Sequence, residues 1–194
     1  MIYLLRHGQT TYNAEGRMQG QSESALSPLG ARQAQAMADL LKTLIPDPRG
    51  WRLVASPLGR TRQTAAAVSA ALGLAVEIDE RLIEVGVGAW QGRLTKEIGA
   101  EYPELFKSRE WFFHAPGGET YEQMEVRLTS WLADQPPEAE RKVIAVSHGV
   151  AGRILRGLYL DLPRAEALQQ PVPQDAIFCL DDGAVTRIDC EPVG

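Results

Sequence analysis

The 194-residue chain is predicted to fold as an α/β protein: a three-layer α/β/α sandwich with a mixed, mostly parallel central sheet and a C-terminal hairpin. Three observations predict this class. Short apolar runs alternate with segments of helical periodicity, helix-start signals follow the apolar runs, and two strand-like runs flank an Asp-Gly turn near the C-terminus. No linker or composition break divides the chain, so residues 1–194 are expected to form one domain.

The N-terminal half alternates between strands and helices. The apolar run Met1–Leu5 predicts a buried strand, and the polar residues 8–25 that follow predict a loop. Ser27 and Pro28 are typical of a helix start, and apolar residues then recur on one face until Pro46 ends the helix. The next elements expected are a strand at residues 52–55, a helix that starts at Ser56-Pro57, and a strand at residues 76–78.

The C-terminal half opens with an irregular region, Glu84 to Gly118, which is rich in Gly motifs and aromatic residues. One or two short helices are expected there, in the kind of excursion that shapes a binding site. The elements expected after it are a helix at 119–132, a strand at 142–146, a helix at 150–160 and a hairpin at 176–189. The hairpin turn places Cys179 opposite Thr186 and Cys190 well past it, which favours two reduced thiols over a disulfide.

Composition excludes several classes of protein. The formal net charge is -5 without runs of like charge, which argues against binding to nucleic acid or to an anionic membrane surface. No apolar stretch is long enough to span a membrane, and the N-terminus runs directly into a strand without a signal-peptide pattern. A cytoplasmic location is therefore expected. The oligomeric state is left open, a homodimer included.

Reactive side chains follow three of the predicted strands. The first strand ends in Arg6-His7-Gly8, the second leads to Arg60 in the first turn of a helix, and the strand at 142–146 ends in Ser147-His148-Gly149. Ligands of open α/β sheets collect at the carboxyl ends of strands, where helix N-termini direct N–H groups at anions. Two imidazoles and two guanidiniums can meet there, and arginine matches phosphate oxygens. The predicted site therefore binds an anion.

These residues allow other interpretations. A histidine that follows an apolar strand is often structural. His7 and His148 with Glu84 could also hold a transition metal, but Arg6 and Arg60 would repel the cation. A serine or cysteine nucleophile lacks a partner pattern, and neither a Walker loop nor a G-x-G-x-x-G motif is present. We therefore expect no metal and no cofactor.

The motifs, taken together, resemble the signature of the histidine phosphatase superfamily, the phosphoglycerate mutase-like proteins. The resemblance covers residues 2 to about 160 and keeps the family's order. Its motifs are Leu5-Arg6-His7-Gly8-Gln9-Thr10 with Asn13, Gly16-Arg17-Met18-Gln19-Gly20, Leu26-Ser27-Pro28-Leu29-Gly30, Ser56-Pro57-Leu58-Gly59-Arg60, Leu82-Ile83-Glu84 with Trp90-Gln91-Gly92, Pro116-Gly117-Gly118-Glu119-Thr120 with Arg127, and Val146-Ser147-His148-Gly149.

The resemblance implies a role for each reactive residue. His7 would be the nucleophile that takes the phosphoryl group onto a ring nitrogen. Arg6, Arg60 and His148 would form a cationic cradle for the phosphoryl oxygens. Glu84 would be the general acid and then the general base, a role that needs a carboxyl with its proton retained near neutrality. The residues that would line the substrate and phosphate pocket are Thr10, Asn13, Gln19, Gly20 and Gly149.

Several residues near these motifs receive weaker assignments. Arg62 is expected to be structural or salt-bridging, because it faces away from Arg60 on the helix, and His114 is expected to be an exposed loop residue. The aromatic run Trp111 to Phe113 is interpreted as core rather than as a substrate wall, and Glu119 either caps its helix or supports the pocket. Residues 21–25 depart from the family's usual Asp and Pro, which leaves substrate preference open there.

Within the family, the sequence favours hydrolysis over mutase chemistry. Related mutases cover the site with a long insertion, and here only residues 92–115 separate the Trp-Gln-Gly and Pro-Gly-Gly-Glu motifs. The predicted function is metal-independent hydrolysis of a small phosphorylated metabolite through a phosphohistidine on His7. The alternative is cofactor-dependent phosphoglycerate mutase-type transfer. Candidate substrates are sugar phosphates, phosphorylated amino acids and nucleotide-loop precursors of cobalamin.

Overall fold

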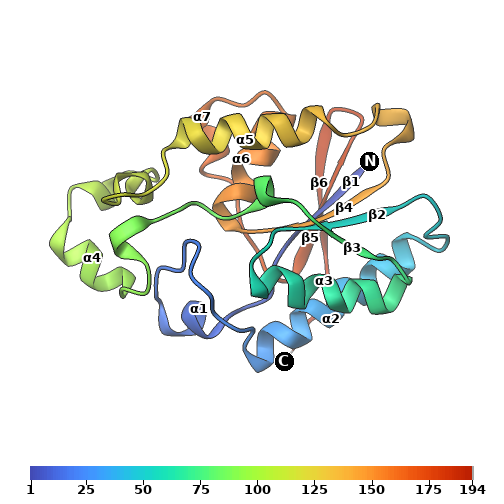
Figure 1. Cartoon of the computed structure of the whole chain (residues 1–194), viewed down its shortest axis with the longest axis horizontal. Coiled ribbons are helices and arrows are strands. Elements are labelled where there is room, and N and C mark those ends of the chain that lie inside the picture. The colour runs from blue at the N-terminus through green and yellow to red at the C-terminus, as the bar shows by residue number, and fades with distance from the viewer. Residues whose placement is uncertain (194) are drawn as a thin grey trace.

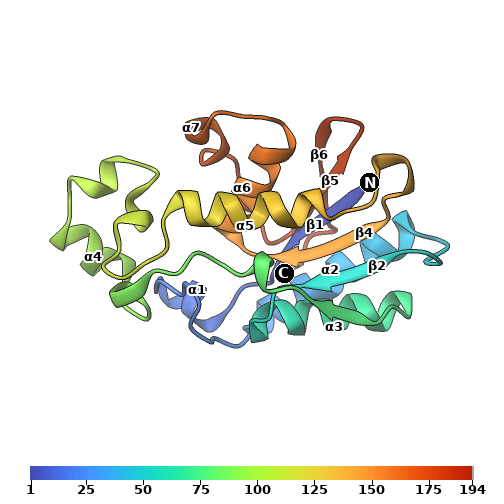
Figure 2. The same cartoon turned by 45° about the horizontal axis from the view of Figure 1, so that its top comes forward.

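A computed structural model describes residues 1–193 as a six-stranded sheet covered by helices on both faces. Figures 1 and 2 show α5, α6 and α7 on one side of the sheet and α2 and α3 on the other. The strands are β1 (Ile2–Arg6), β2 (Arg52–Ala55), β3 (Val76–Ile78), β4 (Val143–Ser147), β5 (Ala176–Asp181) and β6 (Ala184–Asp189). The helices are α1 (Thr11–Glu15), α2 (Pro28–Leu44), α3 (Gly59–Leu72), α4 (Thr95–Glu101), α5 (Tyr121–Ala133), α6 (Gly149–Tyr159) and α7 (Arg164–Ala167).

The sheet has the order β3-β2-β4-β1-β5-β6. The pairs β3–β2, β2–β4 and β4–β1 are parallel, whereas β5 pairs antiparallel with both β1 and β6. The predicted three-layer architecture with a mostly parallel sheet and a terminal hairpin is thus confirmed. Because β4 lies between β1 and β2, the carboxyl ends of three parallel strands meet at one edge.

The central strand β1 is buried on both faces, as a strand in a covered parallel sheet must be. Ile2 and Leu4 belong to the core beneath α5 and α6, whereas Tyr3 and Leu5 belong to the core beneath α2 and α3. None of the four side chains exceeds 5% exposure. The apolar run at the N-terminus therefore contributes side chains to both hydrophobic cores.

Four helices differ from the prediction. The segment 8–25, predicted as a loop, contains the short helix α1, which a capping box between Thr10 and Asn13 begins. Helix α3 begins at Gly59 rather than at Ser56, because the Ser56 hydroxyl contacts the imidazole of His148 instead of capping the helix. Helix α5 begins two residues later than expected, and α7 was not predicted at all.

The hairpin and the irregular segment agree with their predictions. Asp182 and Gly183 both have positive φ, which suits a two-residue hairpin turn, and Cys179 pairs with Thr186 across the strands. Both cysteines are free thiols. The segment after β3 holds α4 and several short 3-10 turns, and Figure 1 shows it projecting beyond the edge of the sheet where β1 ends. Among residues 1–193, no helix is long and apolar enough to cross a membrane.

Two glycines allow the loop after β1 to pack directly on the start of α2. A Cβ placed on Gly8 would lie 2.2 Å from the carbonyl oxygen of Gly30, and one on Gly30 would lie 1.9 Å from that of Gln9. Backbone meets backbone here, so neither side can yield by a rotamer change. The glycines of two family motifs, Arg6-His7-Gly8 and Ser27-Pro28-Leu29-Gly30, are therefore explained by this single contact.

We expect Gly30→Ala to lower the free energy of unfolding by about 2 kcal/mol or more, because the added methyl group forces the backbone apart. Gly152→Ala in α6 is the matched control. Its Cβ would meet only Leu4 Cδ2, at an ordinary 3.9 Å, and alanine favours the helix by up to about 1 kcal/mol. Urea unfolding of both variants measures the difference. Equal stabilities of the two variants would contradict the close approach.

Candidate active site

The edge between β1 and β4 brings the predicted residues together. Arg6 lies opposite Ser147 in the parallel register, and the backbone N–H of His7 donates to the Ser147 carbonyl at 3.1 Å. His148 follows Ser147 at the start of α6. From the other side of β4, the N–H of Ser56 donates to the Val146 carbonyl at 3.0 Å. Two histidines distant in sequence thus come to lie with ring centroids 5.2 Å apart.

A hydrogen bond to the backbone fixes the tautomer of His7. Its Nδ1 lies 2.8 Å from the Gly8 carbonyl oxygen, which can only accept a hydrogen bond, so Nδ1 carries the proton. The other ring nitrogen of His7, Nε2, has no hydrogen-bond partner within residues 1–193, and the ring borders a cleft whose lining is described below. Burial lowers the pKa of His7 well below 6.5, and the charges of Arg60 and Arg6 lower it further. The imidazole is therefore neutral at neutral pH, with a lone pair toward the cleft.

His148 lies behind His7 rather than on the cleft surface. Arg60 Nε donates to its Nδ1 at 3.3 Å, which leaves Nε2 to donate to the Ser56 hydroxyl at 2.7 Å. Burial lowers the pKa of His148 well below its ordinary value, and the charges of Arg60 and Arg6 add to this effect. Both ring nitrogens have hydrogen-bond partners, and the bond at Nδ1 helps to hold the Arg60 side chain in position.

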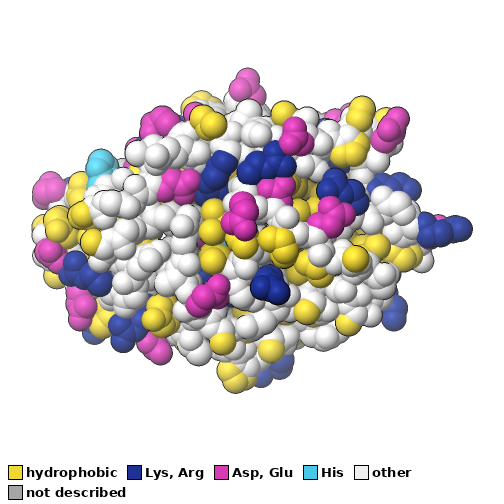
Figure 3. Space-filling view, viewed as in Figure 1, with side chains coloured by type: hydrophobic (Ala, Val, Ile, Leu, Met, Phe, Trp, Pro, Cys, Tyr) yellow, Lys and Arg dark blue, Asp and Glu magenta, His cyan; other side chains and the backbone are white. Residues whose placement is uncertain are grey.

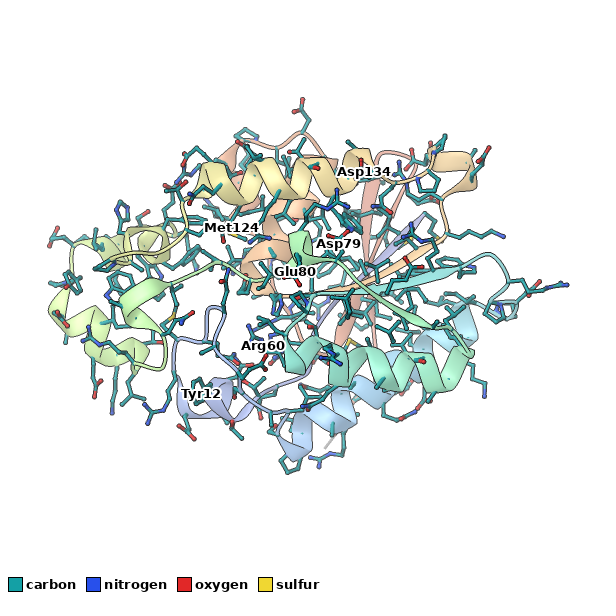
Figure 4. The ribbon with its side chains drawn as sticks, in the orientation of Figure 1. Tyr12, Arg60, Asp79, Glu80, Met124 and Asp134 are labelled. Atoms are coloured by element: carbon teal, nitrogen blue, oxygen red, sulfur yellow. The ribbon has the colours of Figure 1, made fainter. Side chains whose placement is uncertain are left out.

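Arg60 joins the start of α3 to the loop after α1. Figure 4 shows it at the beginning of α3, on the opposite side of the sheet from Met124 of α5. Besides its contact with His148, it donates to the carbonyls of Ser22 and Gly20 at 2.8 and 2.7 Å. Three of its five N–H groups are thereby used, and two remain for a ligand in the cleft. Burial lowers its pKa, an effect that Glu84 opposes.

Arg6 contributes the second guanidinium, on a side chain that is partly buried. Its Nη1 donates to the carbonyl of Val172 at 2.5 Å, while its buried Nε lacks a partner among the described residues. Burial lowers its pKa to about 10, so it stays charged at neutral pH. An unpartnered N–H in a cationic cleft suits an oxyanion, because a charged acceptor would satisfy it.

Glu84 sits at the N-terminus of α6. Its Oε1 accepts from the N–H groups of Val85 and Ala151 at 3.0 Å, and its Oε2 accepts from that of Val150 at 3.1 Å. The N–H groups of Val150 and Ala151 belong to the first turn of α6, where backbone N–H groups have no partner within the helix. A Cβ on Gly149 would lie 3.7 Å from Glu84 Oε2 and 3.6 Å from Arg6 Nε, so this glycine lies between the Glu84 carboxyl group and the Arg6 guanidinium.

An ion pair from α5 holds the loop that carries Glu84. Arg127 and Glu119 pair at 2.7 Å, and each side chain is only 16% exposed. Arg127 also donates to the Arg81 carbonyl at 2.6 Å, and Glu119 accepts from the N–H of Gly86 at 3.2 Å. Thr120 caps α5 instead of Glu119. Of the two roles that the sequence left open for Glu119, the structure shows support of the pocket.

The cleft has a volume of about 240 Å³ and combines cationic, polar and apolar walls. Its lining includes Arg6, His7, Asn13, Arg17, Met18, Gln19, Gly20, Arg60, Glu84, Trp111, Phe112, Gly149, Arg153 and Val172. Most of the predicted site residues are thus in place. Phe112 belongs to the core, Trp111 packs against it, and both also border the cleft. These two aromatic residues are therefore part of the core and part of the cleft wall.

Asn13 is oriented by two donors. The Thr10 backbone N–H and the Gln174 side chain donate to its Oδ1 at 3.2 and 3.1 Å, which leaves its NH₂ group for the cleft. Thr10 itself is fully buried and does not line the cleft: its hydroxyl caps α1 and donates to Gln19 at 2.8 Å. It positions two cleft residues rather than facing a ligand.

Sequence reasoning missed three residues at this site. Arg17 and Arg153 line the cleft, and Gln174 reaches it from the loop before β5. Arg153 could have been found, because it lies four residues after Gly149 and so shares its helix face. Nothing in the sequence points to Gln174, since only the pairing of β5 with β1 brings its loop here. Figure 3 shows why composition was no guide: acidic and basic side chains are intermixed over the visible surface.

Two basic residues lie outside the site, as expected. Arg62 and His114 are both exposed, and neither lines the cleft. Arg62 was expected to be structural or salt-bridging, and within residues 1–193 it forms no ion pair. The metal-binding alternative required His7, His148 and Glu84 to cluster. In the described chain, no three His, Cys, Asp or Glu side chains gather closely enough to hold a metal ion.

The fold and this site define a class of protein. The chain belongs to the histidine phosphatase superfamily, branch 1, whose family model matches residues 2–185. The enzymes of this superfamily are mutases or phosphatases.

Among curated proteins, the chain is similar to the probable phosphoglycerate mutase GpmB of Enterobacter sp. (strain 638), with 38% identity over 84% of this chain and 75% of that protein. Among solved structures, it is similar to mycobacterial glucosyl-3-phosphoglycerate phosphatase in complex with VO3, with 32% identity, 92% coverage of both chains and a TM-score of 0.74. The YhfR protein of Bacillus stearothermophilus shares 26% identity at a TM-score of 0.78, over 97% of this chain and 95% of that one.

The two buried, neutral imidazoles make the free energy of unfolding depend on pH. Because the folded state holds the pKa of both His7 and His148 below the unfolded value near 6.5, the unfolded state binds more protons below that pH. The free energy of unfolding should therefore fall as pH falls below about 6.5, by up to about 1.4 kcal/mol per pH unit for each imidazole.

Urea unfolding between pH 5 and 7 measures this slope. His148→Gln should make it shallower, whereas His114→Gln, which changes an exposed imidazole, should leave it unchanged. The same slope in wild type and His148→Gln would show that His148 is not held neutral.

Proposed function

We propose that the protein hydrolyses a small phosphomonoester through a covalent phosphohistidine on His7. The observation that carries the proposal is the tautomer of His7: its Nδ1–H is fixed by the Gly8 carbonyl at 2.8 Å, and its Nε2 lone pair faces a cationic cleft. Membership of the histidine phosphatase superfamily supports it.

In the first step, His7 Nε2 attacks the phosphorus atom while the bond from phosphorus to the ester oxygen breaks. Charge on the transferring group is greatest at its three equatorial oxygens. The free N–H groups of Arg6, Arg60 and Asn13 are placed to stabilise those oxygens. The N-terminus of α6 adds a positive end of a helix dipole at the same cleft.

Glu84 supplies the proton. Its Oε2 accepts one backbone hydrogen bond and Oε1 accepts two, so Oε2 has the lone pair free to carry a proton toward the leaving alkoxide. In the second step, water gives its proton to Glu84 and attacks the phosphorus, the P–N bond breaks, and inorganic phosphate leaves.

Hydrolysis and mutase-type transfer share the first step and differ in the fate of the phosphoryl group. The short segment between Gly92 and Pro116, which contributes only Trp111 and Phe112 to the cleft wall, supports water as the acceptor. The similarity to a solved glucosyl-3-phosphoglycerate phosphatase points the same way. Transfer back to a sugar acid is the second candidate, and the similarity to a probable phosphoglycerate mutase favours it.

His7→Ala should reduce phosphate release by at least about 10³-fold, because no other group in the cleft can form the P–N bond. Acid-labile, base-stable incorporation of phosphate into the wild-type chain from a labelled phosphomonoester should disappear with it. His114→Ala is the matched control and should keep both signals. Undiminished turnover in His7→Ala would overturn the phosphohistidine mechanism.

A panel of phosphomonoesters, assayed for phosphate release beside a 3-phosphoglycerate isomerisation assay, separates hydrolysis from transfer. We expect phosphate release without a bisphosphorylated primer, and the same rate after treatment with EDTA. Isomerisation that requires a primer, with no net phosphate, would favour the mutase. Activity lost on chelation and restored by a divalent cation would revive a metal site.

A further inference from the structure

Residues 93–115 form a projection that contains no strand of the sheet. Figure 1 shows its helix α4 well beyond the edge where β1 ends. The two ends of the projection meet at its base, where the N–H of Ala89 donates to the Pro116 carbonyl at 2.9 Å. This bond fixes where the projection leaves the body of the protein and where it returns. The outer part of the projection needs contacts of its own to hold its place.

One ion pair joins the projection to the rest of the described chain. Among the ion pairs of residues 1–193, only that of Glu110 reaches outside the projection, to Arg164 of α7 at 2.8 Å. Two other ion pairs lie wholly within the projection: Arg93 with Glu101, and Lys107 with Glu104. The charged connection between the projection and the body of the protein therefore depends on the single side chain of Arg164.

Arg164 divides its guanidinium between two partners. Its Nη2 lies 2.8 Å from Glu110 Oε2, and its Nη1 donates to Glu122 Oε1 of α5 at 2.8 Å. An arginine that serves one carboxylate can hold it with two parallel N–H bonds, so this division joins two separate segments instead. The guanidinium carbon also lies 4.2 Å from the ring centre of Tyr121 and 5.5 Å from that of Phe113. One side chain of α7 thus holds α5 and the projection together.

These contacts lie outside the cleft, on either side of part of its wall. Glu110, Phe113 and Arg164 do not line the cleft, whereas Trp111 and Phe112 do. The two wall residues lie between Glu110 and Phe113 in the chain, and they share one short 3-10 turn with Phe113. Because both flanking residues contact Arg164, a shift of either would move the wall residues between them.

We propose that Arg164 is a positioning residue that holds the aromatic wall, Trp111 and Phe112, in place from outside the cleft. Its effect on turnover rests on the proposed function. The cationic groups near His7 suit the phosphoryl group, which leaves the aromatic wall for the organic part of the ester. Arg164 therefore acts on the binding of that part rather than on the P–N chemistry. The side chains of Arg164 and Glu110 are 34% and 32% exposed, so salt weakens their contact.

Hydrogen exchange of the full chain, followed by mass spectrometry, tests the contact without any turnover. Arg164→Gln should make the amides of residues 105–113 exchange about threefold to tenfold faster, because an ion pair and a cation–π contact are lost. The amides of β1 and β4 should be unchanged. Sodium chloride at about 1 M should speed exchange in the wild type but not in Arg164→Gln. Arg52→Gln, which removes an ion pair with Glu77 of β3, is the matched control and should leave residues 105–113 unchanged.

Two further variants separate the two partners of Arg164. Glu110→Gln removes the contact to the projection and should reproduce the faster exchange, and combining it with Arg164→Gln should add nothing further. Glu122→Gln removes only the contact to α5 and should have a smaller effect on residues 105–113. The reverse order, with Glu122→Gln active and Glu110→Gln silent, would overturn the proposal, because Arg164 would then serve α5 rather than the wall.

Two esters of different size test the consequence for turnover. Phenyl phosphate carries a ring that can reach the wall, whereas the methyl group of methyl phosphate is too small to do so. Arg164→Gln should raise the KM for phenyl phosphate about threefold or more with kcat unchanged, and should leave kcat/KM for methyl phosphate unchanged. Arg164→Lys keeps a charge that can pair with Glu110 and should recover part of the loss.

Four results would overturn the proposal or the function beneath it. Unchanged exchange in Arg164→Gln means that the contact does not hold the projection, and exchange that rises equally in β1 and β4 means that Arg164 acts on global stability. An unchanged KM for phenyl phosphate, or an equal loss on both esters, removes the positioning role. A wild type that releases phosphate from neither ester counts against the proposed function instead, and the exchange measurements then decide whether Arg164 holds the wall.

Discussion

The concentration of buried positive charge between β1 and β4 is the constraint on which the rest of the site depends. Arg60 is fully buried and Arg6 is partly buried beside two imidazoles, which is costly unless the charges find partners. The partners are backbone carbonyls: those of Val172 for Arg6, and of Gly20 and Ser22 for Arg60. Carbonyls hold the guanidiniums in place and leave their full charge for a ligand.

Arginines at the surface differ from the cleft arginines in their hydrogen-bond partners. Exposed or half-exposed arginines such as Arg52 and Arg81 pair with carboxylates at 2.5 to 2.7 Å, where the charge is cancelled. The one acid in the cleft, Glu84, is directed at the N-terminus of α6 rather than at an arginine. Acid and cations can therefore act on a substrate separately. Burial keeps both histidines neutral, and the charges of Arg60 and Arg6 add to this effect, because a proton on either ring would add to a field that is already positive.

The sequence predicted much of this because its signals are local. Buried strands, the cap at Ser27 and the Asp-Gly hairpin depend on neighbours a few residues away, and each was confirmed. It was wrong where a distant partner outweighed a local signal. Ser56 carries a helix-start pattern, yet its hydroxyl contacts His148, which lies 92 residues away in sequence. The helix α1 was hidden in a polar segment because its stability comes from one capping box and contacts to the loop after it.

By itself, the sequence determined the class of fold and the family, and it located most of the residues that line the cleft, because strand ends and motifs consist of consecutive residues. Only the tertiary structure decided what those residues do to one another. It placed His148 behind His7, turned Thr10 from the cleft, made Glu119 the partner of Arg127, and left Arg153 without a counter-charge. Hydrogen bonds and charges act through space, and the distances that govern them are set by sheet order and helix packing.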